Sequence, residues 1–523
     1  MKFLASLPLI LFWLLLFACK SQIVASIPPT STTVRVVQGA TIPASERTLQ
    51  PIQGVEIENT PEISPPPTAG RECPPSAGIP AITYTAAVNI SFSQRTAQAT
   101  QNIRYLNLTG ETLENIVFDV EANRIPNAFT LNSLLVNGGD APAYELTGRE
   151  MNVHLPHPLS PGCAVEIDMN FRLVPPAIGE GAAGIGGYFG YSQRQMNFGN
   201  VLPFLAARQN GDWVIHPVTA IGEQIVAEAA NWSVTLSVEG APDDLVVAAP
   251  GIIEQVGDGA IHASIDGSRD FAFSLNAGAA LASQTTANGV VVEMITFEDA
   301  LVHGENGIIQ GPAHALEAAS RAIEMFSDLF GEYPYDRLVI VQGDFPDGME
   351  YTGLVFVSGE WFRSYPGTPA SYLFLITVHE VAHQWWYSSV GNDQAFNPFL
   401  DEALATYSEI TFLEEFYPDL RDWWWNFRVS TFLPPDYAGL PINSTVYQFD
   451  AARPYINAIY LNGAKMLEAL RQDLGTDVFF NWLRRYAEAS ARRIVTPEQF
   501  WSLLSPLQLE TVAETRARFE GGE

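Results

Sequence analysis

Hydrophobic and polar side chains alternate along most of the first half of the chain. From about Ile82 to Ala280, β-branched or aromatic residues alternate with polar ones, as in Ala87–Phe92 and Trp232–Val238, and Gly, Asn and Pro interrupt the runs. A period of two residues places alternate side chains on the two faces of a strand. The pattern predicts an N-terminal domain, residues 81–288, made of antiparallel β-strands with few helices.

The pattern changes after residue 288. Val290–Thr296 and Arg337–Val341 have the composition of strands, and Gly311–Phe330 has the periodicity of an amphipathic helix. Helical patterns dominate from Thr368 to the last residue. We therefore expect a second domain at 289–523, with an α+β part at 289–367 and a helical part at 368–523.

The first residues have the pattern of an export signal. Met1 and Lys2 precede a largely apolar stretch, Phe3–Ala18, and Cys19 follows it directly. Residues 16–19, Leu-Phe-Ala-Cys, resemble a bacterial lipobox, in which the cysteine receives a diacylglycerol. This predicts a lipoprotein signal peptide at 1–18 and an extracytoplasmic protein of the bacterial cell envelope, anchored to a membrane through Cys19. An ordinary signal peptide and an uncleaved anchor are the alternatives, and the stretch is shorter than the ~20 apolar residues of a membrane span.

Residues 19–80 are rich in Pro, Ser and Thr and lack amphipathic periodicity. This composition predicts a disordered, extended tether. The two remaining cysteines, Cys73 and Cys163, have no soft metal ligands near them in the sequence. An oxidising compartment would allow them to form a disulfide, and two free thiols are the alternative.

Composition and charge exclude several classes of protein. The chain has 523 residues, 47% of them hydrophobic and 16% charged, and its formal net charge is −31. The apolar content is too high for an intrinsically disordered chain. A charge of this sign repels phosphate groups, so we expect no nucleic-acid partner and no direct adsorption to anionic lipids.

The strongest chemical signal is the segment His379-Glu380-Val381-Ala382-His383. Two histidines four residues apart lie on one face of a helix, about one turn apart, so both imidazoles can reach one metal ion. Glu380 would project beside them toward a water molecule on the metal. The alternative is a pair of helix histidines with ordinary contacts.

A third ligand is expected from the next helix. Glu402 follows His383 by enough residues to finish one helix, turn, and begin another. Two imidazoles and one carboxylate leave a fourth tetrahedral position open for water, as in catalytic zinc sites. Asp401 is the neighbouring candidate, and it lies about 100° away around the helix, so only one of the two is expected to face the metal.

The segments His379–Trp386 and Leu400–Ala405 resemble the aminopeptidase N family of gluzincin zinc metallopeptidases. The resemblance implies one Zn²⁺ per chain on His379, His383 and Glu402, with Glu380 as the general base. It also implies the fold of that family, a saddle-like N-terminal β domain followed by a thermolysin-like α+β and helical zinc-peptidase domain. Phe92–Asn107 and Trp232–Pro250 are similar to the family's N-terminal domain.

Two further segments resemble functional motifs of the family. Gly348, Met349 and Glu350 lie in a segment similar to the exopeptidase signature G-x-M-E-N, in which Asp347 replaces the first glycine. A carboxylate on an edge strand near the metal could bind the α-ammonium of a substrate while the strand pairs with the peptide. Tyr460 lies in a segment similar to Y-x-K-G-A, which implies an oxyanion-stabilising phenol.

Tyr455 is a nearby competitor for that role, and ordinary packing is the alternative for Tyr460. Only about sixty residues follow Tyr460, so we expect a short form without the family's large C-terminal helical domain and with a more open cleft.

These features predict a zinc-dependent aminopeptidase that removes residues from peptides with a free N-terminus. A secreted gluzincin endopeptidase and a catalytically inactive lipoprotein binding module are the alternatives.

Overall fold

The computed structural model describes residues 80–139, 141–179, 185–305 and 307–521, all of which fall in the unit 65–523. The predicted signal peptide, tether and lipidation site at Cys19 lie outside the described residues. Cys163 is disulfide-bonded, but Cys73 is not among the described residues, so the pairing of these two cysteines stays a prediction. Within the described ranges, no helix is both long and apolar enough to span a membrane.

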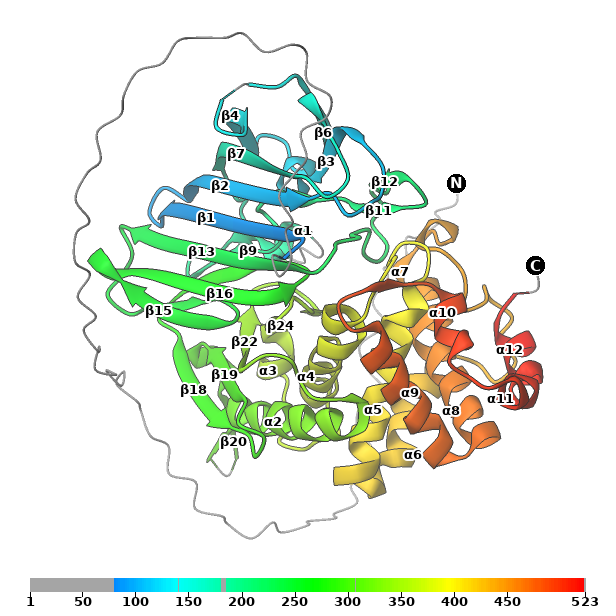
Figure 1. Ribbon diagram of the computed structural model, residues 1–523. Coiled ribbons are helices and arrows are strands. Elements are labelled where there is room, and N and C mark those ends of the chain that lie inside the picture. Colours follow the sequence, from blue (N-terminus) through cyan, green and yellow to red (C-terminus); the bar gives the residue numbers. More distant parts are fainter. Residues whose placement is uncertain (1–79, 140, 180–184, 306, 522–523) are drawn as a thin grey trace, which may run out of the picture. The chain divides into compact units, whose positions relative to one another are not determined.

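The N-terminal part is built around a seven-stranded sheet (Figure 1). Its strands lie in the order β15 (Ile252–Val256), β16 (Ala260–Ser268), β13 (Ala230–Glu239), β1 (Ile82–Ser91), β2 (Thr96–Leu106), β7 (Ala164–Leu173) and β4 (Phe129–Val136). All neighbours are antiparallel except β1 and β13, which are parallel. The prediction of a mainly antiparallel β domain is confirmed.

Two four-stranded sheets and a two-stranded ribbon complete this part. One sheet has the order β10 (Phe204–Leu205), β3 (Leu113–Asp119), β6 (Glu150–Leu159) and β5 (Tyr144–Thr147). The other has the order β14 (Leu245–Ala248), β17 (Phe273–Ala277), β9 (Gln195–Phe198) and β8 (Phe189–Tyr191). The ribbon pairs β11 (Ala207–Gln209) with β12 (Asp212–Val214), and one short helix, α1 (Ile185–Tyr188), precedes β8.

Burial follows the sequence alternation closely. In β1 the residues Tyr84, Ala86, Val88 and Ile90 are buried, while the residues between them are at least partly exposed. The ring of Tyr84 stacks on Trp232 with 3.9 Å between ring centroids. Removal of these apolar side chains from water drives the formation of the domain.

The second part contains a five-stranded mixed sheet. Its order is β18 (Ala280–Thr285), β19 (Val291–Thr296), β22 (Arg337–Gly343), β24 (Leu354–Ser358) and β23 (Gly348–Met349). Two small ribbons join it, β20 (Val302–Gly304) with β21 (Gly307–Ile309), and β25 (Gly391–Asn392) with β26 (Ile494–Val495).

The boundary between the two parts differs from the predicted position at 288/289. β18 was expected in the N-terminal domain, but it forms a hairpin with β19 and is an edge strand of the second sheet. Every residue of β18 is exposed, so its sequence holds no burial signal that could assign it to one sheet.

Helices dominate from residue 311 onward. They are α2 (Gly311–Phe330), α3 (Gly359–Arg363), α4 (Tyr372–Ala382), α5 (Glu402–Phe416), α6 (Arg421–Trp424), α7 (Ala452–Ile456), α8 (Asn462–Leu474), α9 (Thr476–Ser490), α10 (Pro497–Ser502), α11 (Pro506–Thr511) and α12 (Ala513–Phe519). Helix α2 contacts β18 and β19, and α4 contacts α2, α5 and the strands β23 and β24 (Figure 1). Helix α4 is therefore held between the sheet and the helical region.

Helix α4 begins at Tyr372, four residues after the start of the helical pattern at Thr368. Its N-cap is Ser371, whose hydroxyl accepts a hydrogen bond from the backbone N–H of Phe374. After His383 the chain kinks within Gln384–Ser389, where Trp386 and Tyr387 have non-helical backbone angles, before it enters β25. The structure thus ends the regular helix at the second histidine.

Arg269 connects the two parts of the chain. This buried side chain lies between β16 and β17, and its guanidinium donates hydrogen bonds to four backbone carbonyls. The acceptors are Tyr387 at 2.7 Å, Ala227 at 2.9 Å, Ser389 at 3.1 Å and Arg493 at 2.7 Å. Two of them belong to the turn that follows α4, so Arg269 anchors the end of that helix to the β domain.

We predict that Arg269→Met lowers the free energy of unfolding by about 3 kcal/mol, because buried carbonyls that lose a charged donor keep their desolvation cost. Chemical denaturation measures the change. Arg172→Met, at an exposed position of β7, is the control and should stay within about 0.5 kcal/mol of the original protein. Equal stabilities of the two variants would contradict the role of Arg269.

Candidate metal centre and active site

The two histidines of the predicted motif meet at the end of α4. His379 and His383 are both buried, and their ring centroids lie 4.7 Å apart at an interplanar angle of 78°. One helical turn separates them, so both rings project from the same face toward α5. The helix spacing therefore brings the two rings together as the sequence predicted.

Glu402 completes the set from the first turn of α5. Its Oε2 atom lies 3.3 Å from Nε2 of His379 and 3.5 Å from Nε2 of His383. Burial would raise the pKa of Glu402, but the adjacent histidines lower it below its usual range. One ionised oxygen and two imidazole nitrogens thus converge on one point.

Asp401 takes a different role from Glu402. Its Oδ1 atom accepts a hydrogen bond from Nδ1 of His383 at 2.6 Å. The structure resolves the choice between these neighbouring carboxylates, because Glu402 faces the Nε2 atoms and Asp401 lies on the far side of the His383 ring.

His379 has a matching carboxylate that the sequence analysis missed. Its Nδ1 atom lies 3.1 Å from Oε1 of Glu409. Burial alone would raise the pKa of Glu409, but the Arg428 guanidinium and His379 lower it below its usual range. Trp424 also donates a hydrogen bond to Glu409 at 2.9 Å. Glu409 follows Glu402 by seven residues, two helical turns on the same face of α5, and this spacing was the available signal.

These residues fit a divalent metal ion. Ligand atoms of His379, His383 and Glu402 all lie within 4.8 Å of one another. A histidine that binds through Nε2 keeps its proton on Nδ1, and each Nδ1 here faces a carboxylate that accepts a hydrogen bond from it. Two neutral imidazoles, one carboxylate and an open fourth position match a catalytic zinc site.

Glu380 lies beside the ligand set with an unused oxygen. Its Oε2 atom is buried and has no hydrogen-bond partner in the protein. Burial raises the pKa of Glu380 to about 7, although His379 and His383 lower it. A carboxylate with such a pKa can accept and return a proton near neutral pH.

Gly348 leaves space for this carboxylate. A Cβ atom at Gly348 would lie 1.9 Å from Oε1 of Glu380 and would displace it. The preceding residue, Asp347, has a φ of 63°, a left-handed conformation that glycine and aspartate adopt more readily than most residues. The replacement of the family's glycine by Asp347 is therefore compatible with the turn.

The predicted exopeptidase segment forms an edge of the second sheet. Gly348 and Met349 form β23, which pairs with β24 on one side only. The Met349 side chain is buried in a hydrophobic cluster, and Glu350 follows it at the end of the strand. The edge leaves backbone groups of β23 available for a peptide.

A second carboxylate approaches Glu350 from the N-terminal part. Oxygen atoms of Glu223, Glu350 and Glu402 lie within 4.8 Å of one another. Burial raises the pKa of Glu223 to about 8 and that of Glu350 well above its usual range. No spacing or motif in the sequence pointed to Glu223, because it lies in an irregular segment of the β domain far from the metal motif.

Tyr460 and Tyr455 both lie near the metal ligands. The ring of Tyr460 is parallel to His379 at 5.9 Å, and the Glu402 carboxylate contributes, after burial, to the raised pKa of its hydroxyl. Tyr460 is only partly buried, whereas Tyr455 is 3% exposed and packs against Phe449. Tyr460 is therefore the more exposed of the two phenols, and its ring lies against a candidate metal ligand.

Comparison with known proteins agrees with this geometry. The family model described as "Peptidase family M1 domain" matches residues 314–519, which include every residue of the metal site. This segment is a peptidase family M1 domain. Glu223 lies outside this segment, in the N-terminal part, so the group of carboxylates beside the ligand set draws on both parts of the chain.

Curated relatives match the same region. Aminopeptidase M1-A of Oryza sativa subsp. japonica is 29% identical over 201 residues, which are 36% of this chain and 23% of that protein. The thyrotropin-releasing hormone-degrading ectoenzyme of Homo sapiens is 27% identical over 241 residues, which are 42% of this chain and 21% of that protein. The chain thus spans less than a quarter of the length of these relatives.

Solved structures resemble a larger part of the chain. The M1 zinc metallopeptidase of Deinococcus radiodurans has a TM-score of 0.59 at 19% identity, and the match covers 84% of this chain and 94% of that one. A mutant of that enzyme bound to a Tyr-Ser-Ala substrate also has a TM-score of 0.59, at 17% identity. The chain has the multidomain M1 peptidase fold, with a β-rich N-terminal domain and a helical C-terminal region.

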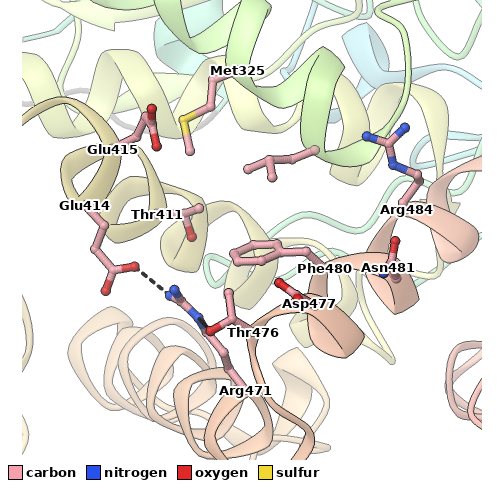
Figure 2. Close-up of a pocket in the computed structure, with 11 residues that line it drawn as sticks. Met325, Thr411, Glu414, Glu415, Arg471, Thr476, Asp477, Phe480, Asn481 and Arg484 are labelled. Carbon is pink, nitrogen blue, oxygen red and sulfur yellow. Dashed lines mark hydrogen bonds and ion pairs between the residues drawn. The ribbon is translucent and has the colours of Figure 1, made fainter.

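A separate cavity of about 610 Å³ lies between α2, α5, α8 and α9 (Figure 2). Its lining is mixed in charge, and an ion pair of 2.6 Å joins Glu414 to Arg471. None of the metal-site residues lines it. Glu414 belongs to the same helix as Glu409, so it provides a carboxylate for comparison.

We predict that Glu409→Gln weakens zinc binding by about 10- to 100-fold, because His379 loses the charged acceptor that orients its ring. Competition with a chelating indicator measures the affinity. Glu414→Gln removes a charge from the same helix and should leave zinc affinity unchanged. A Glu409→Gln variant that binds zinc like the original protein would contradict this role.

Proposed function

We propose that the protein is a zinc-dependent aminopeptidase that hydrolyses the first peptide bond of substrates with a free N-terminus. The observation that carries the proposal is the arrangement of Glu223 and Glu350 beside a zinc-type ligand set. Glu350, which directly follows an edge strand, and the partly buried Glu223, from the segment between β12 and β13, form a site for one cation next to the reacting centre. The α-ammonium of a peptide carries a positive charge and N–H donors, which complement the two carboxylates.

His379, His383 and Glu402 would hold the zinc ion. Bound Zn²⁺ supplies Lewis-acid chemistry, in that it polarises a carbonyl oxygen and lowers the pKa of a bound water molecule. The chain's contribution is a buried ligand set in which each imidazole is fixed by a carboxylate, Glu409 or Asp401.

Glu380 would act as the general base. Its unpartnered Oε2 can accept a proton from the attacking water and return it to the leaving amine. The hydroxyl of Tyr460 would donate a hydrogen bond to the oxyanion that forms on the scissile carbonyl. Both groups lie beside the ligand set, Glu380 next to His383 and the Tyr460 ring parallel to that of His379.

Glu350 and Glu223 would set the register of the substrate. Ion pairs with the ammonium group are strong in a buried site because little water screens them. The edge strand β23 could pair with the peptide backbone while Glu350 and Glu223 hold its first residue. One residue would then leave in each catalytic cycle.

The similar proteins support the proposal of a zinc-dependent aminopeptidase. Several of the matched relatives are aminopeptidases, including aminopeptidase 2 of Candida albicans, and a matched structure is that of an M1 zinc metallopeptidase with a tripeptide substrate. We also propose the finer description of the fold, with a saddle-like N-terminal domain and a thermolysin-like catalytic domain. The mixed sheet packed on helix α4 supports the second of these.

We further propose that the protein is attached to a membrane of the bacterial cell envelope through a lipid on Cys19. The charged start, the apolar stretch Phe3–Ala18 and the small residue before the cysteine support this proposal. Mass spectrometry of the mature protein would identify an acylated Cys19 at its N-terminus.

We predict that a chromogenic L-amino-acid amide with a free amine is cleaved at least roughly 100-fold faster, in kcat/KM, than its N-acetyl counterpart, because acetylation removes the charge that Glu350 and Glu223 bind. Glu350→Gln should reduce this ratio, and a chelator should abolish both reactions. Equal rates for the two substrates would contradict an aminopeptidase and indicate an endopeptidase instead.

We predict that Glu380→Gln lowers kcat by about 10²- to 10⁴-fold, the usual effect of losing a general base. Zinc content should stay at one ion per chain, because Glu380 is not among the three ligands. Steady-state kinetics and metal analysis of the same preparation measure both quantities. Turnover at the original rate would exclude Glu380 as the base.

A further inference from the structure

Gln394 lies between the amine-binding carboxylate and the metal ligands. It is 4% exposed and belongs to the loop between β25 and α5. Its Nε2 group donates one hydrogen bond to Oδ2 of Asp401 at 2.7 Å and another to Oε1 of Glu350 at 3.4 Å. Neither the metal motif nor the exopeptidase segment includes this residue.

The two hydrogen bonds of Gln394 link the proposed amine site at Glu350 with Asp401, which contacts the metal ligand His383. A side-chain amide nitrogen carries two hydrogens, and here they serve two carboxylates at once. Asp401 in turn accepts the proton of His383 Nδ1. A continuous path of hydrogen bonds therefore runs from Glu350 through Gln394 and Asp401 to a metal ligand.

The surrounding loop holds Gln394 in place. The Asn392 side chain donates to the backbone carbonyl of Asn397 at 2.9 Å. Asp393 Oδ1 accepts from the backbone N–H of Phe396 at 3.0 Å. The ring of His216, from the N-terminal part, meets the other oxygen of Asp393 at 2.8 Å. These hydrogen bonds hold the residues before and after Gln394, so the loop fixes the position of its amide between Glu350 and Asp401.

We propose that Gln394 is a positioning residue that couples the amine site to the metal site. The inference rests on the proposed function, because it takes Glu350 as the group that meets the substrate's ammonium. Gln394 orients Glu350 toward the substrate and, through Asp401, orients His383 toward the metal. A change in one carboxylate is therefore transmitted to the other, and loss of the amide weakens both sites together.

The test compares two variants. Gln394→Leu keeps the approximate size of the side chain and removes its hydrogen-bond donors. Gln394→Glu keeps the shape but replaces the amide with a carboxylate, which when ionised has no donor. Gln101→Leu is the matched control, since Gln101 is equally buried and its Nε2 donates only to the backbone carbonyl of Pro203, in the β domain. Three quantities are measured: thermal midpoint, zinc affinity by competition with a chelating indicator, and affinity of the zinc-loaded protein for a free amino acid, with L-leucine and L-arginine as probes.

We expect both Gln394 variants to lose about tenfold in zinc affinity and about tenfold in amino-acid affinity, the effect of one lost hydrogen bond to a charged group. In kinetics on the zinc-loaded enzyme, KM for the free-amine substrate should rise more than kcat falls. The control should lower the thermal midpoint and leave both affinities unchanged.

Loss of only one affinity in the Gln394 variants would overturn the coupling, and so would a fall in thermal midpoint with neither affinity changed. A failure of the proposed function has a different signature. In that case the original protein itself would not distinguish the free-amine substrate from its N-acetyl form, whatever the Gln394 variants do.

Discussion

Burial of several carboxylates around two histidines is the constraint on which the rest of the site depends. Glu350, Glu380, Asp401 and Glu402 are buried and Glu223 is partly buried, in surroundings where an isolated negative charge costs free energy. Burial accordingly raises the pKa of Glu223, Glu350 and Glu380. Such a cluster is stable only if cations and hydrogen-bond donors compensate it, and both the metal ion and the ammonium group that we propose to bind there would meet this requirement.

The fold meets this requirement by bringing donors from several elements. Arg428 and Trp424 compensate Glu409, which fixes His379, and Gln394 serves two carboxylates with one amide. Glu223 belongs to the β domain. Arg269 connects that domain to the catalytic part through hydrogen bonds to backbone carbonyls. A change at that connection would alter the end of α4, and with it His383, although no metal ligand is touched.

The candidate residues that the structure brings together as expected share one property, which is that local geometry determines their positions. The positions of His379 and His383 follow from helix periodicity, and a carboxylate near the start of the next helix was expected, with Glu402 as the candidate and Asp401 as its neighbour. The placement of Glu350 at an edge strand was expected from the resemblance of its segment to the exopeptidase signature, and Glu350 directly follows the edge strand β23. By contrast, Glu223 lies more than a hundred residues from every other site residue along the chain, and no local pattern connects them. The edge strand β18 was placed in the wrong domain for a related reason, because its exposed residues carry no signal for the sheet that it joins.

The sequence by itself determined the alternation of the β domain, the helix that carries both histidines, the choice of ligand types and the excess of negative charge. These are properties of short segments, which obey the periods of strands and helices. Only the tertiary structure decided that Glu402 rather than Asp401 faces the metal, that Glu223 joins Glu350, and that Gln394 lies between two carboxylates. Those outcomes depend on the directions of side chains from distant elements, and packing sets such directions only when the whole domain has folded.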